Sequence, residues 1–401
     1  MRGTPHFVGK RLREAREARE FTATGLADLV GVSKQTISQI ENDKQTPSAE
    51  VMEKLAGALH FPMAFFLRPV FENEGDTPPL FYRSMSALTK SARIRAERRF
   101  GWLRQIVQYA SRFVDLPAVA FISLDIEDPR DLSDGQIELI ANKVRHSWGL
   151  KDGPISNLVG LLENNGAIVA RCDLGPPTLD AFSYWDHLDN RPYIVLGTSK
   201  PTAARARMDA AHELAHMVLH RRINRKLLTN PSVFKLLESQ AFRFAGAFLL
   251  PATSFAAEAQ FVSLESLKSL KAKWMVAIQT VIMRMSDLGF LSETKEGNLW
   301  RNLSRRGWRT NEPLDDVLEI ERPRLLKRSF DMLLDNGIDP AANLGLELGI
   351  RAEDMEAVCG LSSGYLSVDR VDQVIMFPGA SQSASAPSWN DPKPIQFPNE
   401  A

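Results

Sequence analysis

The sequence predicts a mostly helical α+β protein with more than one domain, and three observations carry this prediction. Residues 1–68 alternate short apolar stretches with turn residues, in the rhythm of a small helical bundle. Residues 132–251 mix helical and strand patterns, and residues 264–359 return to helical patterns. A length of 401 residues fits two or three compact units, at about 100 to 200 residues per domain.

The overall composition excludes several classes of protein. An apolar fraction of 44% and a charged fraction of 24% are typical of globular chains and exclude a collagen, a coiled-coil rod and a wholly disordered chain. The 49 Lys and Arg residues balance the 49 Asp and Glu residues, so any attraction to nucleic acid has to be local. Cys172 and Cys359 lack metal-finger spacing, which indicates a reducing compartment. Since no apolar run approaches about 18 residues, we expect a cytoplasmic protein without membrane association.

The chain divides where its composition changes. Pro69 closes the first helical bundle, and Pro, Ser, Ala and Gly dominate after Phe377. We expect a helical domain at 1–69, a basic helical linker at 70–130, a mixed domain at 131–262, a helical C-terminal region at 263–375 and a disordered tail at 376–401.

Several elements are predicted within these segments. In the mixed domain, residues 137–150 form a predicted helix, and residues 166–171 and 192–196 form predicted strands of a small sheet. In the C-terminal region, two helical patterns meet near Trp274 and Val276. Further helices follow over residues 331–359, punctuated by Gly337, Gly345 and Gly349.

The most basic stretch is residues 81–112, where eight Lys and Arg residues face Glu97 as the single acid. One interpretation is a solvated helix face that joins two domains. The other is a surface that contacts the phosphates of DNA.

A helix, a tight turn and a second helix are predicted around Gly31, which permits the positive φ of the turn. Ser33 is a natural N-cap for a helix over residues 34–41, and Ile37 and Ile40 can pack beneath the first helix. The opposite face is left free. It carries side chains of the types that contact bases and phosphates, namely Lys34, Gln35, Thr36, Ser38 and Gln39, and Lys44 follows.

The stretch over residues 9–67, with SKQTISQIENDKQTPS at its centre, resembles the Xre or lambda-repressor-like helix-turn-helix family. The resemblance implies a lambda-repressor-like helical domain that binds double-stranded DNA. Residues 1–69 hold ten Lys and Arg against eight Asp and Glu, and so small an excess predicts a homodimer on a two-fold DNA site. The alternative is a helical bundle that binds no DNA.

A second motif, HExxH, spans residues 212–216. On a helix, His212 and His216 lie four residues apart on one face and can present two imidazole nitrogens to one Zn²⁺. Glu213 is rotated by about 100° from His212, so it is placed to take a proton from a metal-activated water.

A catalytic zinc takes a third protein ligand. Residues 235–250 form a predicted helix, and Glu238 lies on its apolar stripe, where a carboxylate is costly unless it is paired or binds a metal. Glu238 is therefore the expected third ligand. The alternative is Glu213 together with Asp209 and a water.

The segments ARARMDAAHELAHMVLH and LLESQAFRFAGAFLLP together resemble the ImmA/IrrE family of metallopeptidases over roughly residues 130 to 260. The resemblance implies a reduced thermolysin-like fold, a Zn²⁺ site of His212, His216 and Glu238, Glu213 as the general base and acid, and cleavage of helix-turn-helix repressors. It also implies that the strand at 192–196 pairs with an extended substrate. Gln240 departs from the family pattern, in which many relatives carry an acid there.

Some roles stay open. His220 either orients the metal site or simply packs, and the oxyanion donor is one of Arg205, Arg207, Tyr193 or His220. The zinc site is catalytic or, alternatively, closed and structural.

Three functions are consistent with these features. The first is a DNA-binding transcriptional regulator whose zinc endopeptidase cleaves a repressor-like partner. The second is a regulator whose peptidase-like domain is a non-catalytic sensor or dimerisation module. The third is an autoproteolytic switch that cuts its own chain between Pro69 and Leu132.

Overall fold

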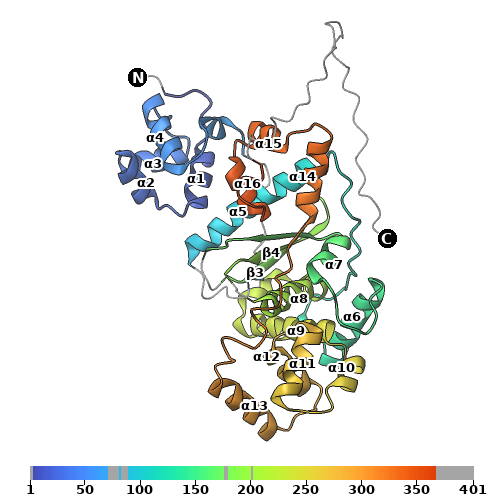
Figure 1. The fold of residues 1–401 in the computed structure, drawn as a ribbon. Helices are drawn as coiled ribbons and strands as arrows, with labels where there is room; N and C mark the ends of the chain where they lie inside the picture. Colours follow the sequence, from blue (N-terminus) through green and yellow to red (C-terminus); the bar gives the residue numbers. More distant parts are fainter. Residues whose placement is uncertain (1–2, 71–80, 83–88, 176–178, 200–201, 367–401) are drawn as a thin grey trace, which may run out of the picture. The chain divides into compact units, whose positions relative to one another are not determined.

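The computed structural model describes residues 3–70, 81–82, 89–175, 179–199 and 202–366 (Figure 1). The chain forms two compact units. The first unit comprises residues 1–79, 87–116 and 326–401, and the second comprises residues 80–86 and 117–325. The mostly helical α+β class predicted from the sequence is confirmed. The tail expected at 376–401 lies outside the described residues.

The described part of the first unit is helical and begins with the expected helical bundle. Its elements are α1 (Gly9–Ala18), α2 (Ala23–Val30), α3 (Lys34–Glu41), α4 (Ala49–Leu59), the short 3-10 helix η1 (Met63–Leu67), α5 (Lys90–Ala110), α14 (Leu325–Asp335), α15 (Pro340–Leu348) and α16 (Ala352–Cys359). Leu12, Leu26, Ile37, Leu55 and Phe65 have no exposed surface and form the centre of the bundle. Burial of this apolar surface holds the short helices together, since helices of this length are marginal alone.

Most of the described part of the basic stretch is α5, which packs against α1, and two of its arginines form ion pairs with acids in and just after that helix. Arg95 pairs with Glu20 at 2.9 Å, and Arg98 pairs with Glu17 at 2.9 Å. These arginines are therefore neutralised by the helical bundle, because each lies within ion-pair distance of an acid.

The C-terminal helices α14 to α16 complete the first unit. Arg19, just after α1, donates two hydrogen bonds to Asp354 of α16, at 2.6 and 2.7 Å. Arg112, just after α5, donates to both carboxylate oxygens of Glu347 in α15 at 2.7 Å. The region expected as one piece at 263–375 is thus divided between the two units at residue 325.

The second unit combines the sheet with the remaining helices. Its elements are β1 (Phe81–Tyr82), η2 (Pro129–Asp131), α6 (Asp134–Ser147), α7 (Leu158–Asn164), β2 (Ile168–Cys172), β3 (Ala181–Asp186), β4 (Arg191–Gly197), α8 (Ala203–Leu219), η3 (Arg225–Thr229), α9 (Pro231–Leu249), α10 (Ala252–Glu258), α11 (Leu264–Trp274), α12 (Ile278–Asp287) and α13 (Glu293–Arg305). The expected break between two helices near Trp274 and Val276 is confirmed, with Met275 in the left-handed region at φ 54°.

The sheet has the strand order β1-β3-β4-β2. β3 pairs antiparallel with β4 through a hairpin, β2 pairs parallel with β4, and β1 pairs antiparallel with β3. The expectation that residues 192–196 pair with a substrate is wrong, because these residues belong to β4 and both of its edges are already paired. β3, which was not predicted, lies between β1 and β4.

Helices α8 and α9 pack against each other, and α8 also packs on β3 and β4 (Figure 1). Both helices carry fully buried small residues, namely Ala211 and Ala215 in α8 and Ala241 and Ala245 in α9. A large apolar cluster that includes Leu214, Phe244 and Ile282 surrounds these helices. The site described next is therefore built on rigid, buried elements.

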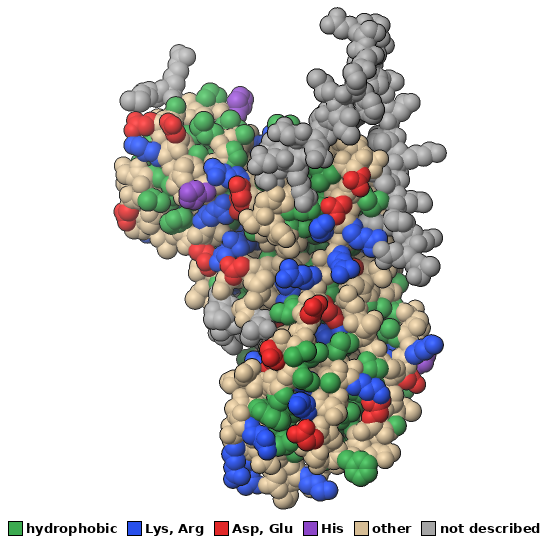
Figure 2. All heavy atoms as spheres, in the orientation of Figure 1, with side chains coloured by type: hydrophobic (Ala, Val, Ile, Leu, Met, Phe, Trp, Pro, Cys, Tyr) green, Lys and Arg blue, Asp and Glu red, His purple; other side chains and the backbone are tan. Residues whose placement is uncertain are grey.

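The surface carries charges of both signs. On the face shown in Figure 2, Lys and Arg side chains alternate with Asp and Glu side chains over each unit rather than forming one extended area of a single sign. None of the helices in the described part of the chain has the length and apolar character needed to cross a bilayer.

Candidate metal centre and nucleic-acid interface

Helix α8 carries the two histidines of the HExxH motif. His212 and His216 lie one helical turn apart, and their ring centroids are 4.8 Å from each other. Their side chains are 2% exposed. The regular helix sets this separation, because residues i and i+4 share one face.

Helix α9 supplies the carboxylate that faces these imidazoles. Asn230 caps this helix by accepting from Ser232 N at 2.9 Å, and Pro231 occupies its first position. Glu238, two turns further on, lies 3.3 Å from Nε2 of His212 and 3.4 Å from Nε2 of His216. The structure thus brings together the three residues proposed as ligands from the sequence.

The possible donor atoms of these three residues are spaced much as ligands around a tetrahedral Zn²⁺ are. The Nε2 atoms of His212 and His216 are 3.1 Å apart. Oε2 of Glu238 is 3.3 Å from Nε2 of His212, and Oε1 is 3.4 Å from Nε2 of His216. Ligands at about 2.0 to 2.1 Å from a tetrahedral ion are separated by roughly 3.3 Å. Neither Glu213 nor Asp209, the alternative ligands, belongs to this cluster.

Glu213 lies next to the cluster and is almost completely buried, with 1% of its surface exposed. Burial raises the pKa of Glu213 from 4.5 to about 7, although the neighbouring His216 and a hydrogen bond from Ser183 oppose the rise. Oγ of Ser183, in β3, donates to Oε2 of Glu213 at 2.6 Å. A carboxyl group with such a pKa can both accept and return a proton near neutral pH.

Glu238 differs from Glu213 in its protonation. Burial alone would raise the pKa of Glu238, but hydrogen bonds and charge interactions with His212 and His216 outweigh burial and lower it to about 2. Its side chain keeps 15% exposure, against 2% for the two imidazoles. The candidate centre therefore holds one ionised carboxylate, and Glu238 is its most exposed side chain.

The candidate oxyanion donors are engaged elsewhere. Arg205 donates to the backbone oxygens of Arg309 and Thr310. Arg207 pairs with Glu321, and Tyr193 donates to Asp189 at 2.6 Å. His220 lies behind His216, with the two Nδ1 atoms 2.9 Å apart, so it faces away from the donor cluster.

A cavity of about 310 Å³ lies one helical turn from the donor cluster. It is lined by Met208, one turn before His212, and by Phe242, one turn after Glu238. The ring centroids of Phe242 and His212 are 4.5 Å apart. Arg243, Arg284 and Asp287 also line it. A side chain of a bound peptide could be accommodated there, because apolar walls and charged groups are both available.

The helix-turn-helix forms as the sequence predicts. Gly31 has φ 73° and ends α2, and Oγ of Ser33 accepts from Thr36 N at 3.0 Å to begin α3. The proposed DNA-contacting residues lie on the solvent side of this motif. Lys34, Gln35, Ser38 and Lys44 are exposed, and Thr36 and Gln39 are half-buried.

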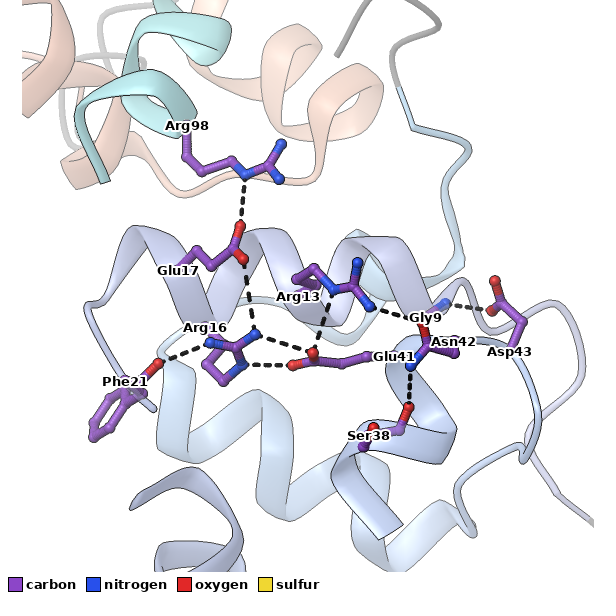
Figure 3. Close-up of polar contacts among 10 residues, drawn as sticks. All are labelled: Gly9, Arg13, Arg16, Glu17, Phe21, Ser38, Glu41, Asn42, Asp43 and Arg98. Atoms are coloured by element: carbon purple, nitrogen blue, oxygen red, sulfur yellow. Dashed lines mark hydrogen bonds and ion pairs between the residues drawn. The ribbon is translucent and has the colours of Figure 1, made fainter. Parts of the chain in front are cut away.

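A buried ion pair fixes α3 against α1 (Figure 3). Glu41, the last residue of α3, is 5% exposed and accepts hydrogen bonds from Arg16 at 2.5 Å and from Arg13 at 3.3 Å. Asp43 adds a bond from Gly9 N at 2.7 Å. The side of α3 that carries Glu41 is thus fixed inside the unit, while the opposite side is free to contact a ligand.

Two residues of the centre could not be assigned from the sequence. Ser183 was missed because β3 was missed, although AFSYWD is rich in the aromatic residues typical of strands. Gln240 was noted only as a departure from a family pattern. Glu238, two residues before it on the same helix, was the residue that the sequence indicated as part of the metal site.

The geometry defines a helix-turn-helix regulator joined to an HExxH peptidase-like domain, and comparisons with known proteins agree. Residues 12–66 match the family model described as helix-turn-helix, and residues 162–286 match the peptidase family model described as the IrrE N-terminal-like domain. The resemblances stated from the sequence are thereby confirmed over these stretches.

Two curated relatives are similar to the N-terminal part. The uncharacterized HTH-type transcriptional regulator RghRB of Bacillus subtilis is 47% identical over 55 residues, which are 14% of this chain and 40% of the relative. The HTH-type transcriptional regulator SutR of Escherichia coli is 30% identical over 69 residues, which are 17% of this chain and 39% of the relative. The match thus spans about two fifths of each relative.

The high pKa of Glu213 predicts a pH-dependent effect on stability in the metal-free chain. A carboxyl group whose pKa is raised by folding stabilises the fold below its unfolded pKa of 4.5, and this contribution is lost as the pH rises through about 7. Glu213→Gln carries no charge at any pH. We therefore expect it to increase the free energy of unfolding near pH 8 by about 3 kcal/mol and to change it little near pH 4. Urea unfolding with a chelator present measures both values, and unchanged or lower stability near pH 8 would contradict the assignment.

Proposed function

We propose that this chain is a cytoplasmic, homodimeric DNA-binding transcriptional regulator that carries a Zn²⁺-dependent endopeptidase and cleaves a repressor-like protein partner. One observation carries the peptidase half. Glu213, with a pKa of about 7, lies beside three donor atoms spaced for a tetrahedral zinc ion. A purely structural metal site needs no such group.

The chemistry follows from the positions of these side chains. The Nε2 atoms of His212 and His216 and the carboxylate of Glu238 would hold the ion, which when bound polarises a carbonyl group and acidifies water. The carboxylate of Glu213 takes a proton from the attacking water and returns it to the leaving amine nitrogen. Ser183 donates to Oε2 of Glu213 and so orients the carboxylate for this transfer.

A protein substrate is favoured over a small molecule by the surroundings of the centre. The cavity beside Phe242 can take one side chain, and the exposed flank of Glu238 leaves room for the chain that carries it. A partner that binds DNA near the same site would be brought close to this centre by the helix-turn-helix.

The DNA half rests on the exposed side of α3. Lys34 and Gln35 are exposed at its N-terminal turn, the part of a recognition helix that contacts base edges and phosphates. Arg95 and Arg98 of α5 pair with Glu20 and Glu17. Because residues 1–69 hold only two more Lys and Arg than Asp and Glu, two copies on a two-fold site are needed for useful affinity.

For DNA binding we expect Gln35→Ala to weaken binding to selected duplexes by about 1 to 3 kcal/mol and to relax sequence preference. Lys34→Ala should make the slope of log affinity against log salt concentration less steep. The reduction should correspond to about two phosphate contacts per complex if a dimer binds, and to about one if a monomer binds. Fluorescence anisotropy at several salt concentrations measures both. Lys273→Ala removes an exposed cation from the second unit and serves as the control. An equal loss of DNA affinity in all three variants would contradict the proposal that α3 contacts DNA.

For hydrolysis we expect Glu213→Gln to keep zinc and to reduce cleavage of a cellular repressor by at least 100-fold. New protein N-termini in cells that express each variant measure this, because each cut creates one. Glu265→Gln makes the same change at an exposed position of α11 and should cleave like the wild type. If zinc-loaded wild type and Glu213→Gln yield the same termini, the domain is a sensor or structural module instead.

A second candidate function, cleavage of the chain's own polypeptide, is favoured by one specific observation. β1 pairs antiparallel with β3, with Phe81 opposite Ser183 and Tyr82 opposite Phe182. Ser183 is the residue that contacts Glu213. An extended peptide bound by β-augmentation pairs with a sheet edge in this way, so β1 occupies the place of a substrate strand.

Cleavage in cis predicts fragments from the purified chain alone. With Zn²⁺ we expect an N-terminal fragment of about 8 to 15 kDa, at about 110 Da per residue, at a rate that does not change on dilution. A chelator and Glu213→Gln should both abolish it. A full-length chain that stays intact with zinc bound would remove this function and leave cleavage of a partner.

A further inference from the structure

We propose that His220 and Gln240 are positioning residues that fix the orientation and the tautomer of His216, so that its Nε2 is ready to bind a metal. The inference rests on the proposed zinc centre. Three contacts carry it: Nδ1 of His216 to Nδ1 of His220 at 2.9 Å, Nε2 of His220 to Oε1 of Gln240 at 3.2 Å, and Nε2 of Gln240 to the oxygens of Pro129 and Leu132 at 2.7 and 3.3 Å.

The amide of Gln240 has only one orientation that satisfies its surroundings. The oxygens of Pro129 and Leu132 are backbone acceptors, so the NH₂ group has to face them and Oε1 has to face His220. Gln240 is 3% exposed. A flipped amide would therefore place oxygen against two carbonyl oxygens in a buried place, which is costly.

The orientation of the Gln240 amide determines the direction of the hydrogen bonds from His216 to His220 and from His220 to Gln240. Because Oε1 of Gln240 accepts, Nε2 of His220 has to carry a proton. His220 has no exposed surface, and a charged imidazole with only neutral hydrogen-bond partners would be unfavourable there. Its Nδ1 is therefore unprotonated and accepts a proton from Nδ1 of His216. This leaves the lone pair of His216 at Nε2, the atom that faces Glu238 and His212.

The same result is reached from the metal side. A zinc ion needs the lone pair of His216 Nε2, which places the proton at Nδ1, and His220 is the acceptor it meets. Imidazole ligands commonly donate their second N–H to a partner that fixes the ring. Here that partner is another imidazole, itself fixed by Gln240, and the backbone at η2 anchors the whole series.

Gln240 is suited to this position because an amide both accepts and donates. A buried carboxyl group at 240 would be protonated, so one oxygen would still accept from His220 and the O–H would donate to Pro129 or Leu132. An apolar side chain would lose all three bonds. The hydrogen-bond relay from Gln240 through His220 to His216 should thus survive Gln240→Glu and fail in Gln240→Met, whereas a role confined to packing would not distinguish the two variants in this way.

The first test uses the unaltered full-length chain without metal. Histidine ring ¹⁵N chemical shifts report the tautomer of each of the seven histidines. We expect the Nδ1–H form for His216 and the Nε2–H form for His220. The opposite tautomer at either residue would overturn the relay, whatever the behaviour of any variant.

The second test compares zinc affinities by competition with a chromophoric chelator. We expect a 10- to 100-fold loss of zinc affinity for Gln240→Met and a loss of less than about threefold for Gln240→Glu, with the ¹⁵N pattern of His216 kept only in the latter. Gln105→Met changes another buried glutamine, in α5, and should leave the affinity unchanged. Wild-type affinity in Gln240→Met would overturn the relay. Failure of the wild type to bind zinc would instead overturn the metal centre, while the tautomer measurement still tests the relay.

Discussion

The close contact between α8 and α9 is the constraint on which the second unit depends. Buried alanines on both helices allow this approach, and the approach places the carboxylate of Glu238 against two imidazoles. A buried ion without a partner costs about several kcal/mol. A divalent cation bound at this point would supply the positive charge that the carboxylate favours, and its binding would stabilise the folded unit.

The two carboxyl groups of the centre show how position sets chemistry. Glu213 and Glu238 both lie near His216, yet burial dominates for Glu213 and raises its pKa to about 7, while two imidazole contacts dominate for Glu238 and lower its pKa to about 2. One group can thus take up and release a proton near neutral pH, and the other remains ionised. The division needs no difference in residue type, because the register of α8 against α9 decides which carboxylate meets the imidazole nitrogens.

The sequence predicted the parts of the fold that depend on local pattern. The turn at Gly31, the cap at Ser33 and the i, i+4 spacing of His212 and His216 are set within a few residues, so each was expected before the structure. Contacts between segments far apart in the chain were not predicted. β3 was missed because its fully buried residues show no alternation of apolar and polar side chains. The ion pairs of Arg95 and Arg98 in α5 were not predicted because their acidic partners lie about 75 to 80 positions earlier in the chain.

The first unit has an unusual relation to the order of synthesis. Its bundle begins near residue 9, but Asp354, which pairs with Arg19, follows 335 residues later. Chains are made from the N-terminus at about 5 to 20 residues per second, so Arg19 waits roughly 17 to 70 seconds for its partner. During that interval the whole peptidase-like unit emerges from the ribosome and can fold. The first unit is thus completed last, although its N-terminal helices are made first.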